Sequence, residues 1–220
     1  MAAETFGEWD LIFDRVHHKL KGETKMNTEK ANANSKCGAT LLRKSDVREK
    51  AEAHGRFVAE CFDKDGNLKW RDTIENVVCT VGKNKALDAY LAGAAYTVTG
   101  PFMGLISSVD YGAGPVAADI MTSHAGWKEA GATNAPTYTA PRKTCAWDAA
   151  AAGAKALSAA LSFVFTGAGT IKGCFLVYHT GAVNTIDNTS GTLYSAGLFT
   201  GGDKVVANTD TLNVTYTASL

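Results

Sequence analysis

Short runs of alternating apolar residues, separated by glycine-containing turns, fill the C-terminal part of this 220-residue chain. Side chains at every second position of a strand share one face of a sheet, so each run predicts a half-buried β-strand. Gly167 and Gly169 favour a turn between the first two runs, and the second run is expected to be a returning strand. The alternating residues are Leu157, Ala159, Leu161, Phe163 and Phe165, then Ile171, Gly173, Phe175 and Val177, and finally Leu212, Val214 and Tyr216.

A second turn signal lies at Asp65 and Gly66, between two strand-like runs. Both residues tolerate positive φ angles, so the pair predicts a β-hairpin. The same run superficially resembles a calcium-binding loop, which needs glycine at position six and glutamate at position twelve. Counted from Asp63, Gly66 is fourth and Ile74 is twelfth, so calcium binding is not expected.

Residues 55–220 are therefore expected to be mainly β, as an antiparallel β-sandwich or jelly-roll-like domain. Residues 110–139 are rich in Gly, Ala and Pro and form a long excursion, with Trp127 and Tyr138 as its anchors. Long loops of this kind are usually functional or lie at interfaces. The sequence also predicts a short helix at Asn84–Leu91, a short apolar strand at Phe102–Ile106 and a strand within Gly191–Phe199.

Residues 1–54 are expected to form an N-terminal arm. Charge separates the two parts, because 16 of the 22 Lys and Arg residues and 15 of the 22 Asp and Glu residues lie within residues 1–88. The arm is expected to begin with an amphipathic helix. A polar linker follows at 23–44 and contains Met26 as an alternative start, and a short helix follows at Ser45–His54. The residues that share one face of this first helix are Trp9, Ile12, Phe13, Val16 and Leu20. We call them the apolar stripe.

Charge and composition narrow the possible partners. The formal net charge is zero, whereas nucleic acids and anionic membranes bind proteins with a cationic excess, so neither is an expected partner. No run approaches the roughly 18 apolar residues of a membrane span, and the N-terminus does not resemble a secretory signal. The five cysteines are widely spaced and odd in number, which favours reduced thiols, several of them buried.

The sequence contains no pattern that indicates catalysis, a cofactor or a metal. HExxH, GxSxG, GxGxxG and CxxC motifs are all missing, and each of the five histidines is expected to lie at the surface or to form ordinary hydrogen bonds. A pair of glycosidase carboxylates needs only proximity in space, so such a pair remains an alternative. Its candidates are Asp110, Asp119, Glu129, Asp148, Asp187, Asp203 and Asp210.

Four stretches, in this order, resemble a group of structural proteins of tailed bacteriophage particles. They are Asp65–Trp70 with Asn76–Gly82, Leu91–Pro101, Arg142–Trp147 with Leu157–Ala159, and Gly191–Gly197 with Asp210–Thr217. The resemblance covers about residues 56–220. It implies a location in the virion, after assembly in the host cytoplasm, and no catalysis.

Three hypotheses follow. The leading one is a non-enzymatic capsid decoration or cement protein, a homodimer or homotrimer that binds the major capsid protein or other virion subunits through the apolar stripe. The second is a head-fibre, tail-fibre or tail-tip module that binds a host surface glycan through the loop 110–139 and Trp127. The third is a β-sandwich hydrolase that uses two close carboxylates.

Overall fold

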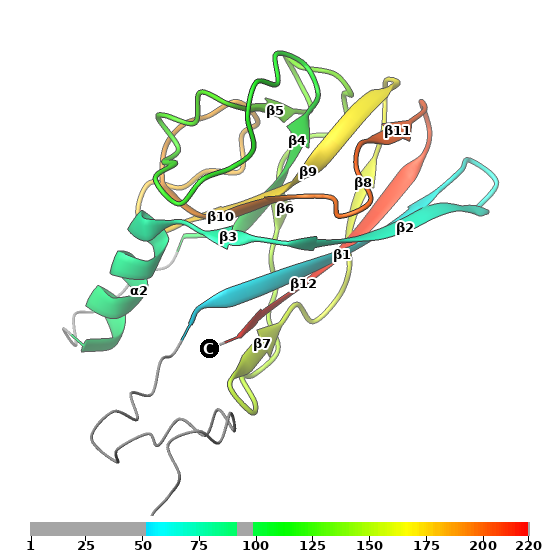
Figure 1. Cartoon of the computed structure of the whole chain (residues 1–220). Coiled ribbons are helices and arrows are strands. Elements are labelled where there is room, and N and C mark those ends of the chain that lie inside the picture. The colour runs from blue at the N-terminus through cyan, green and yellow to red at the C-terminus, as the bar shows by residue number, and fades with distance from the viewer. Residues whose placement is uncertain (1–51, 92–98, 220) are drawn as a thin grey trace, which may run out of the picture. The chain divides into compact units, whose positions relative to one another are not determined.

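The computed structural model describes residues 52–91 and 99–219, which are mainly β-strand with one helix (Figure 1). By its internal contacts the chain divides into two units, residues 1–49 and 50–220, and only the second falls among the described residues. The first expected helix of the arm, with its apolar stripe, lies outside the described residues. The second, expected at Ser45–His54, lies mostly outside them, but its end is wrong because His54 is the first residue of strand β1 (His54–Phe62). The described part contains two antiparallel sheets, in agreement with the predicted β-sandwich class.

The first sheet, sheet A, has the order β2-β1-β12-β7, and β8 shares the β12 edge with β7. The first and last strands of the domain are therefore neighbours at the centre of this sheet. They pair along their whole length, from His54 opposite Ser219 to Phe62 opposite Thr211. The strands are β1 (His54–Phe62), β2 (Leu68–Glu75), β7 (Ala154–Ala156), β8 (Leu161–Val164) and β12 (Thr211–Ser219).

The second sheet, sheet B, has the order β3-β10-β9-β4-β5. The short β11 pairs with β9 and the short β6 pairs with β4, so the long β9 and β4 form the centre of the sheet. The strands are β3 (Val77–Val78), β4 (Phe102–Ser107), β5 (Lys128–Ala130), β6 (Lys143–Thr144), β9 (Gly169–Tyr178), β10 (Thr192–Leu198) and β11 (Lys204–Val206).

The main core lies between the sheets. Alternating residues of β1 and β12 point inward, as the period of two predicted, and they pack against side chains of β4 and β9. The fully or almost fully buried residues of this core include Phe57, Ala59, Cys61, Met103, Leu105, Phe163, Cys174, Leu176, Leu212, Val214 and Tyr216.

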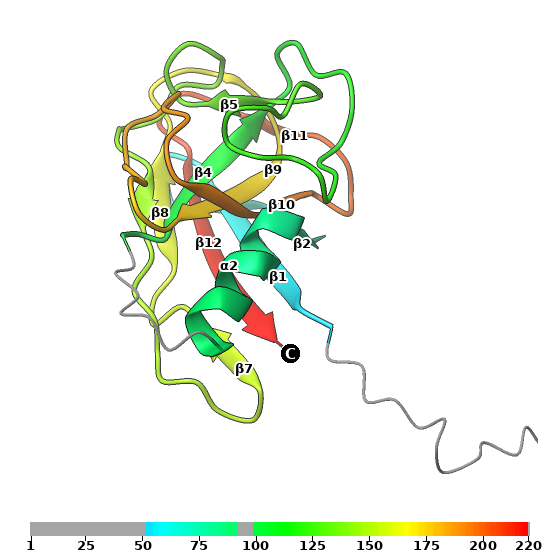
Figure 2. The same ribbon diagram turned by 90° about the vertical axis from the view of Figure 1, so that its left-hand side faces the viewer.

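Sheet B also buries its second face. Phe175 and Val177 of β9 pack there with Trp127 and Met121 of the long loop after β4. Helix α2 (Thr80–Leu91) begins beside the same loop, because the Thr80 amide donates to the Ala117 carbonyl at 2.8 Å. Figure 2 shows the loop and α2 on the same side of β9 and β10. The domain is thus a sandwich with a third layer of loop and helix over sheet B.

Two sequence predictions need correction. The strand after Gly169 does not return beside the preceding strand, because β8 pairs with β12 in sheet A whereas β9 belongs to sheet B. The turn at 166–169 therefore carries the chain from one sheet to the other. Ile171 and Phe175 also do not share a face: a bulge between Ile106 and Ser107 of β4 shifts the register opposite β9, so Ile171 joins the main core and Phe175 the second cluster.

The predicted hairpin at Asp65 and Gly66 is present, and Gly66 has a φ of 83°. Asp63 accepts hydrogen bonds from the amides of Asp65 and Asn67, both at 2.9 Å. Bonds from the Asn67 side chain and backbone hold the pKa of the Asp63 carboxyl below its usual value. The Asp63 carboxylate therefore stabilises the turn by accepting hydrogen bonds from its backbone, as in an Asx turn.

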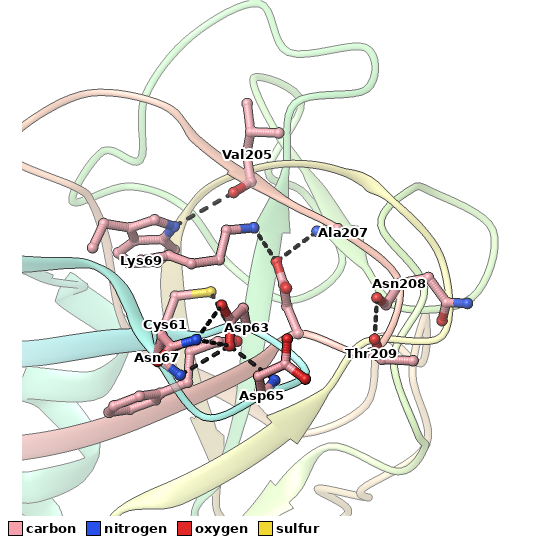
Figure 3. A network of polar contacts seen from close by, with 12 residues as sticks. Cys61, Asp63, Asp65, Asn67, Lys69, Val205, Ala207, Asn208 and Thr209 are labelled. Atoms are coloured by element: carbon pink, nitrogen blue, oxygen red, sulfur yellow. Dashed lines mark hydrogen bonds and ion pairs between the residues drawn. The ribbon is translucent and has the colours of Figure 1, made fainter.

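A polar network attaches this hairpin to the loop before β12 (Figure 3). Lys69 forms an ion pair with Asp210, whose side chain is 4% exposed. Asp210 also accepts from the Ala207 amide at 2.7 Å, and the Trp70 ring donates to the Val205 carbonyl at 3.4 Å. The network joins β2 of sheet A to the segment that links β11 of sheet B to β12.

Asp72 makes a second connection between the sheets. The stability that this connection contributes should depend on pH. Its carboxylate lies 2.6 Å from Lys204 Nζ and accepts from the Gly201 amide at 2.9 Å. Burial acts to raise the pKa of Asp72, but Lys204 and the amides of Thr73 and Gly201 bring it below its usual value.

The Asp72→Asn variant is expected to lose about 1.5–3 kcal/mol of unfolding free energy at pH 7, the range for hydrogen bonds to charged groups. A lowered folded-state pKa stabilises the fold above the unfolded value, about 3.9, and this contribution disappears as the pH falls through the folded value. Urea unfolding at several pH values should therefore show the two proteins converging in acid. A difference that stays constant down to pH 2 would contradict the assignment.

Candidate functional site

A cleft of about 390 Å³ lies over the second face of sheet B, where three loops meet. These are the loop after β4, the loop after β5 and the loop between β9 and β10. Figure 1 shows all three gathered at one end of the domain, around β5. The polar residues of the lining are Thr122, Ser123, His124, Lys128, Glu129, Asn134, Arg142, Asp187, Asn188 and Thr189.

A buried ion pair lies at the base of this cleft. Arg142 is 1% exposed and Glu129 is 6% exposed. The guanidinium binds the carboxylate through two parallel contacts, Nε to Oε1 at 2.8 Å and Nη2 to Oε2 at 2.6 Å. Such a two-pronged geometry is the strong form of an arginine–carboxylate pair.

The pair connects β5 and the loop that follows it to the loop between β9 and β10. Arg142 Nη2 also donates to the Asn188 carbonyl at 2.7 Å, and Nη1 donates to the Val183 carbonyl at 3.2 Å. Glu129 Oε2 accepts from the Asp187 amide at 2.8 Å. The guanidinium carbon lies 5.4 Å from the centre of the Phe175 ring, so the pair rests on sheet B. The ion pair therefore has a structural role at the base of the cleft, and we call it the Glu129–Arg142 clamp.

Glu129 is not free to act as the acid of a glycosidase pair with Asp187. Burial raises the pKa of its carboxyl, and the adjacent guanidinium opposes that shift. Both of its oxygens accept hydrogen bonds from N–H groups of the chain, so the carboxylate is held within the ion pair. The geometry favours a structural role for this carboxylate over the hydrolase alternative.

Trp127 lies in the interior, which corrects the expectation that it forms a glycan-stacking or partner surface. Its side chain is 0% exposed, and its ring nitrogen donates to Asp119 at 2.9 Å. His124 covers it, with the two rings stacked at 4.0 Å and 22°. The imidazole, and not the indole, is the ring that reaches the cleft surface, because His124 is partly exposed.

Sequence reasoning found the loop of the site but not its central pair. Glu129 was one of several scattered carboxylates, and Arg142 stood only within a resemblance stretch. No local signal singled them out, because each stands beside a lysine, Lys128 or Lys143. Buried charges are almost always paired, but which charges are buried is decided by contacts distant in the chain. The remaining candidate residues, those of the apolar stripe, fall outside the described part of the chain.

The cysteines within the described part of the chain do not form a reactive site. Cys61, Cys79, Cys145 and Cys174 are buried free thiols, as expected for reduced cysteines. Burial raises the pKa of Cys61 to about 11 and those of Cys79 and Cys145 to about 12. Thiols with such values are protonated and unreactive at neutral pH. Within residues 52–91 and 99–219, no group of three or more His, Cys, Asp or Glu side chains is arranged to hold a metal ion.

Comparisons with protein family models, with curated proteins and with solved structures found no match to this chain. Among the helices of the described ranges, none is long and apolar enough to cross a membrane.

Proposed function

We propose that this chain is a structural protein of a tailed-phage particle that decorates the capsid. The observation that carries the proposal is the division of the chain into residues 1–49 and a separate β-unit. Within residues 52–91 and 99–219, the β-unit forms two apolar clusters. The apolar stripe belongs to the other unit, and the resemblance to virion proteins covers the β-unit.

In this proposal the arm binds the shell. A single amphipathic helix is marginal in water, so its apolar face needs a surface, which a neighbouring virion subunit supplies. An arm that orders on binding loses conformational entropy but covers a large area of its partner. The β-unit then sits on the shell as a homodimer or homotrimer without any catalytic role.

We further propose a jelly-roll-like topology for the β-unit. The pairing of its first strand, β1, with its last strand, β12, at the centre of sheet A supports this. The crossing of the chain between sheets at residues 166–169 supports it too.

Deleting residues 1–25 should abolish association with particles, while the β-unit keeps its cooperative thermal unfolding. The measurement is co-sedimentation of purified protein with particles that lack it. A finer pair of variants is Phe13→Asp, within the apolar stripe, and Asp14→Ala, one position away on the polar side. Only the first should release the protein. Undiminished binding of the truncated chain would overturn the role of the arm.

Copy number tests the location in the virion. A decoration protein should be present near parity with the major capsid protein in purified particles, as measured by quantitative mass spectrometry. A handful of copies would instead favour the fibre or tail-tip hypothesis.

A further inference from the structure

The cleft over sheet B holds polar groups that the Glu129–Arg142 clamp does not use. The Nδ1 atom of His124 forms a hydrogen bond with the Trp127 carbonyl oxygen at 3.0 Å, which leaves Nε2 as the ring nitrogen for another partner. The Asn134 amide donates to the Glu129 carbonyl at 2.9 Å and keeps its oxygen as an acceptor. Asn188 accepts from the Ser190 amide at 2.8 Å through Oδ1 and keeps its NH₂ group as a donor. Each side chain is fixed at one end and has hydrogen-bonding capacity at the other.

The charges of the lining are balanced. Lys128 and Arg142 oppose Glu129 and Asp187, and the charges of Arg142 and Glu129 offset each other in the buried ion pair. A cleft that captures a phosphate, a sulfate or a metal cation normally carries an excess of the opposite charge. A balanced lining of donors and acceptors instead matches a neutral ligand whose groups both donate and accept.

The cleft also contains apolar surface. The His124 ring is stacked on Trp127, and the Trp127 ring lies 5.3 Å from that of Phe175. Met121, Trp127 and Phe175 are themselves buried, so the ring face that the cleft presents is that of His124. A ring face beside fixed hydrogen-bonding groups suits a ligand with one apolar and one polar side, as sugar rings have.

We propose that this cleft binds a neutral carbohydrate of one or two rings. Its volume of about 390 Å³ lies in the range of small-molecule sites. Because the Glu129–Arg142 clamp holds two of the three loops together, these two need little ordering on binding. The lining residues named here belong to the β-unit, so the proposal goes beyond the capsid role and does not rest on it.

The test is saturation-transfer NMR and calorimetry on the full chain, with a panel of neutral hexoses, deoxyhexoses, N-acetylhexosamines and their disaccharides. We expect at least one to bind with a dissociation constant of about 1 mM or better.

His124→Ala should weaken that binding by about tenfold or more. Thr189→Trp, which places a large side chain on the exposed rim, should do the same by filling the cleft. His54→Ala, an exposed histidine on β1, is the matched control and should bind as the wild type does.

Thermal unfolding of each variant separates lost binding from lost folding. If His124→Ala unfolds, Thr189→Trp still decides the question. The proposal is overturned if no neutral sugar gives a signal at millimolar concentration, or if both cleft variants bind normally. Particle association of Thr189→Trp should be normal, so failure of the carbohydrate site and failure of the capsid role are distinguishable.

Discussion

Replacing Arg142 by methionine is expected to lower the free energy of unfolding by about 3–5 kcal/mol, which is the range for breaking a buried ion pair on one side. The variant leaves the Glu129 carboxylate, 6% exposed, without its counter-charge. It also removes the donors to the carbonyls of Val183 and Asn188. Urea unfolding followed by tryptophan fluorescence measures the loss, because Trp127 lies in the same region.

Two companion variants make the test specific. Adding Glu129→Gln to Arg142→Met removes the unpaired charge and should restore more than about 1 kcal/mol, within the usual coupling between contacting residues. Arg56→Met breaks an exposed pair in which Arg56 Nε lies 3.2 Å from Glu75, with both side chains more than half exposed. It should cost about 1 kcal/mol or less. Equal losses in Arg142→Met and Arg56→Met would contradict the burial of the clamp.

The sequence predicted the parts of this fold that local chemistry decides. The hairpin at Asp65 and Gly66 depends on turn geometry, and the burial of Leu212, Val214 and Tyr216 depends on a period of two; both predictions are confirmed. The helix predicted at Asn84–Leu91 is also present but begins earlier, at Thr80, and its Leu87 is 55% exposed. The sequence signal for the start of this helix was weak, because its first turn has no acidic residue, so the start at Thr80 was not predicted.

The parts that it did not predict depend on contacts distant in the chain. Nothing local to Thr166–Gly169 distinguishes a hairpin from a change of sheet, since the choice depends on β12 and β4. Sheet B is buried on both faces, so β9 is almost continuously buried and an alternating pattern could not assign its faces. Trp127 was expected to anchor its loop, and at an interface or glycan-binding surface; its burial follows from the same third layer.

Strand β9 carries a glycine at position 173, where the backbone of β10 approaches it closely. In a strand interior, glycine weakens packing and usually marks a close approach of another backbone. A Cβ atom added at Gly173 would lie 1.8 Å from the Gly197 carbonyl oxygen and 2.9 Å from the Leu198 Cα of the neighbouring β10. These are backbone atoms of a paired strand, so no side-chain rotation relieves the clash, and β10 has to shift.

Gly173→Ala is therefore expected to lower the unfolding free energy by about 3 kcal/mol or more, at the upper end for overpacking of a buried site. Gly112→Ala is the matched control: no atom lies within 4 Å of its added Cβ and its φ is not positive. That change should stay within about 0.5 kcal/mol of the wild type, as surface substitutions do. Because β10 separates helix α2 from the centre of sheet B, a shifted β10 should also disturb the second cluster around Phe175. A Gly173→Ala protein as stable as the Gly112→Ala protein would mean that β9 and β10 do not pair in the register described.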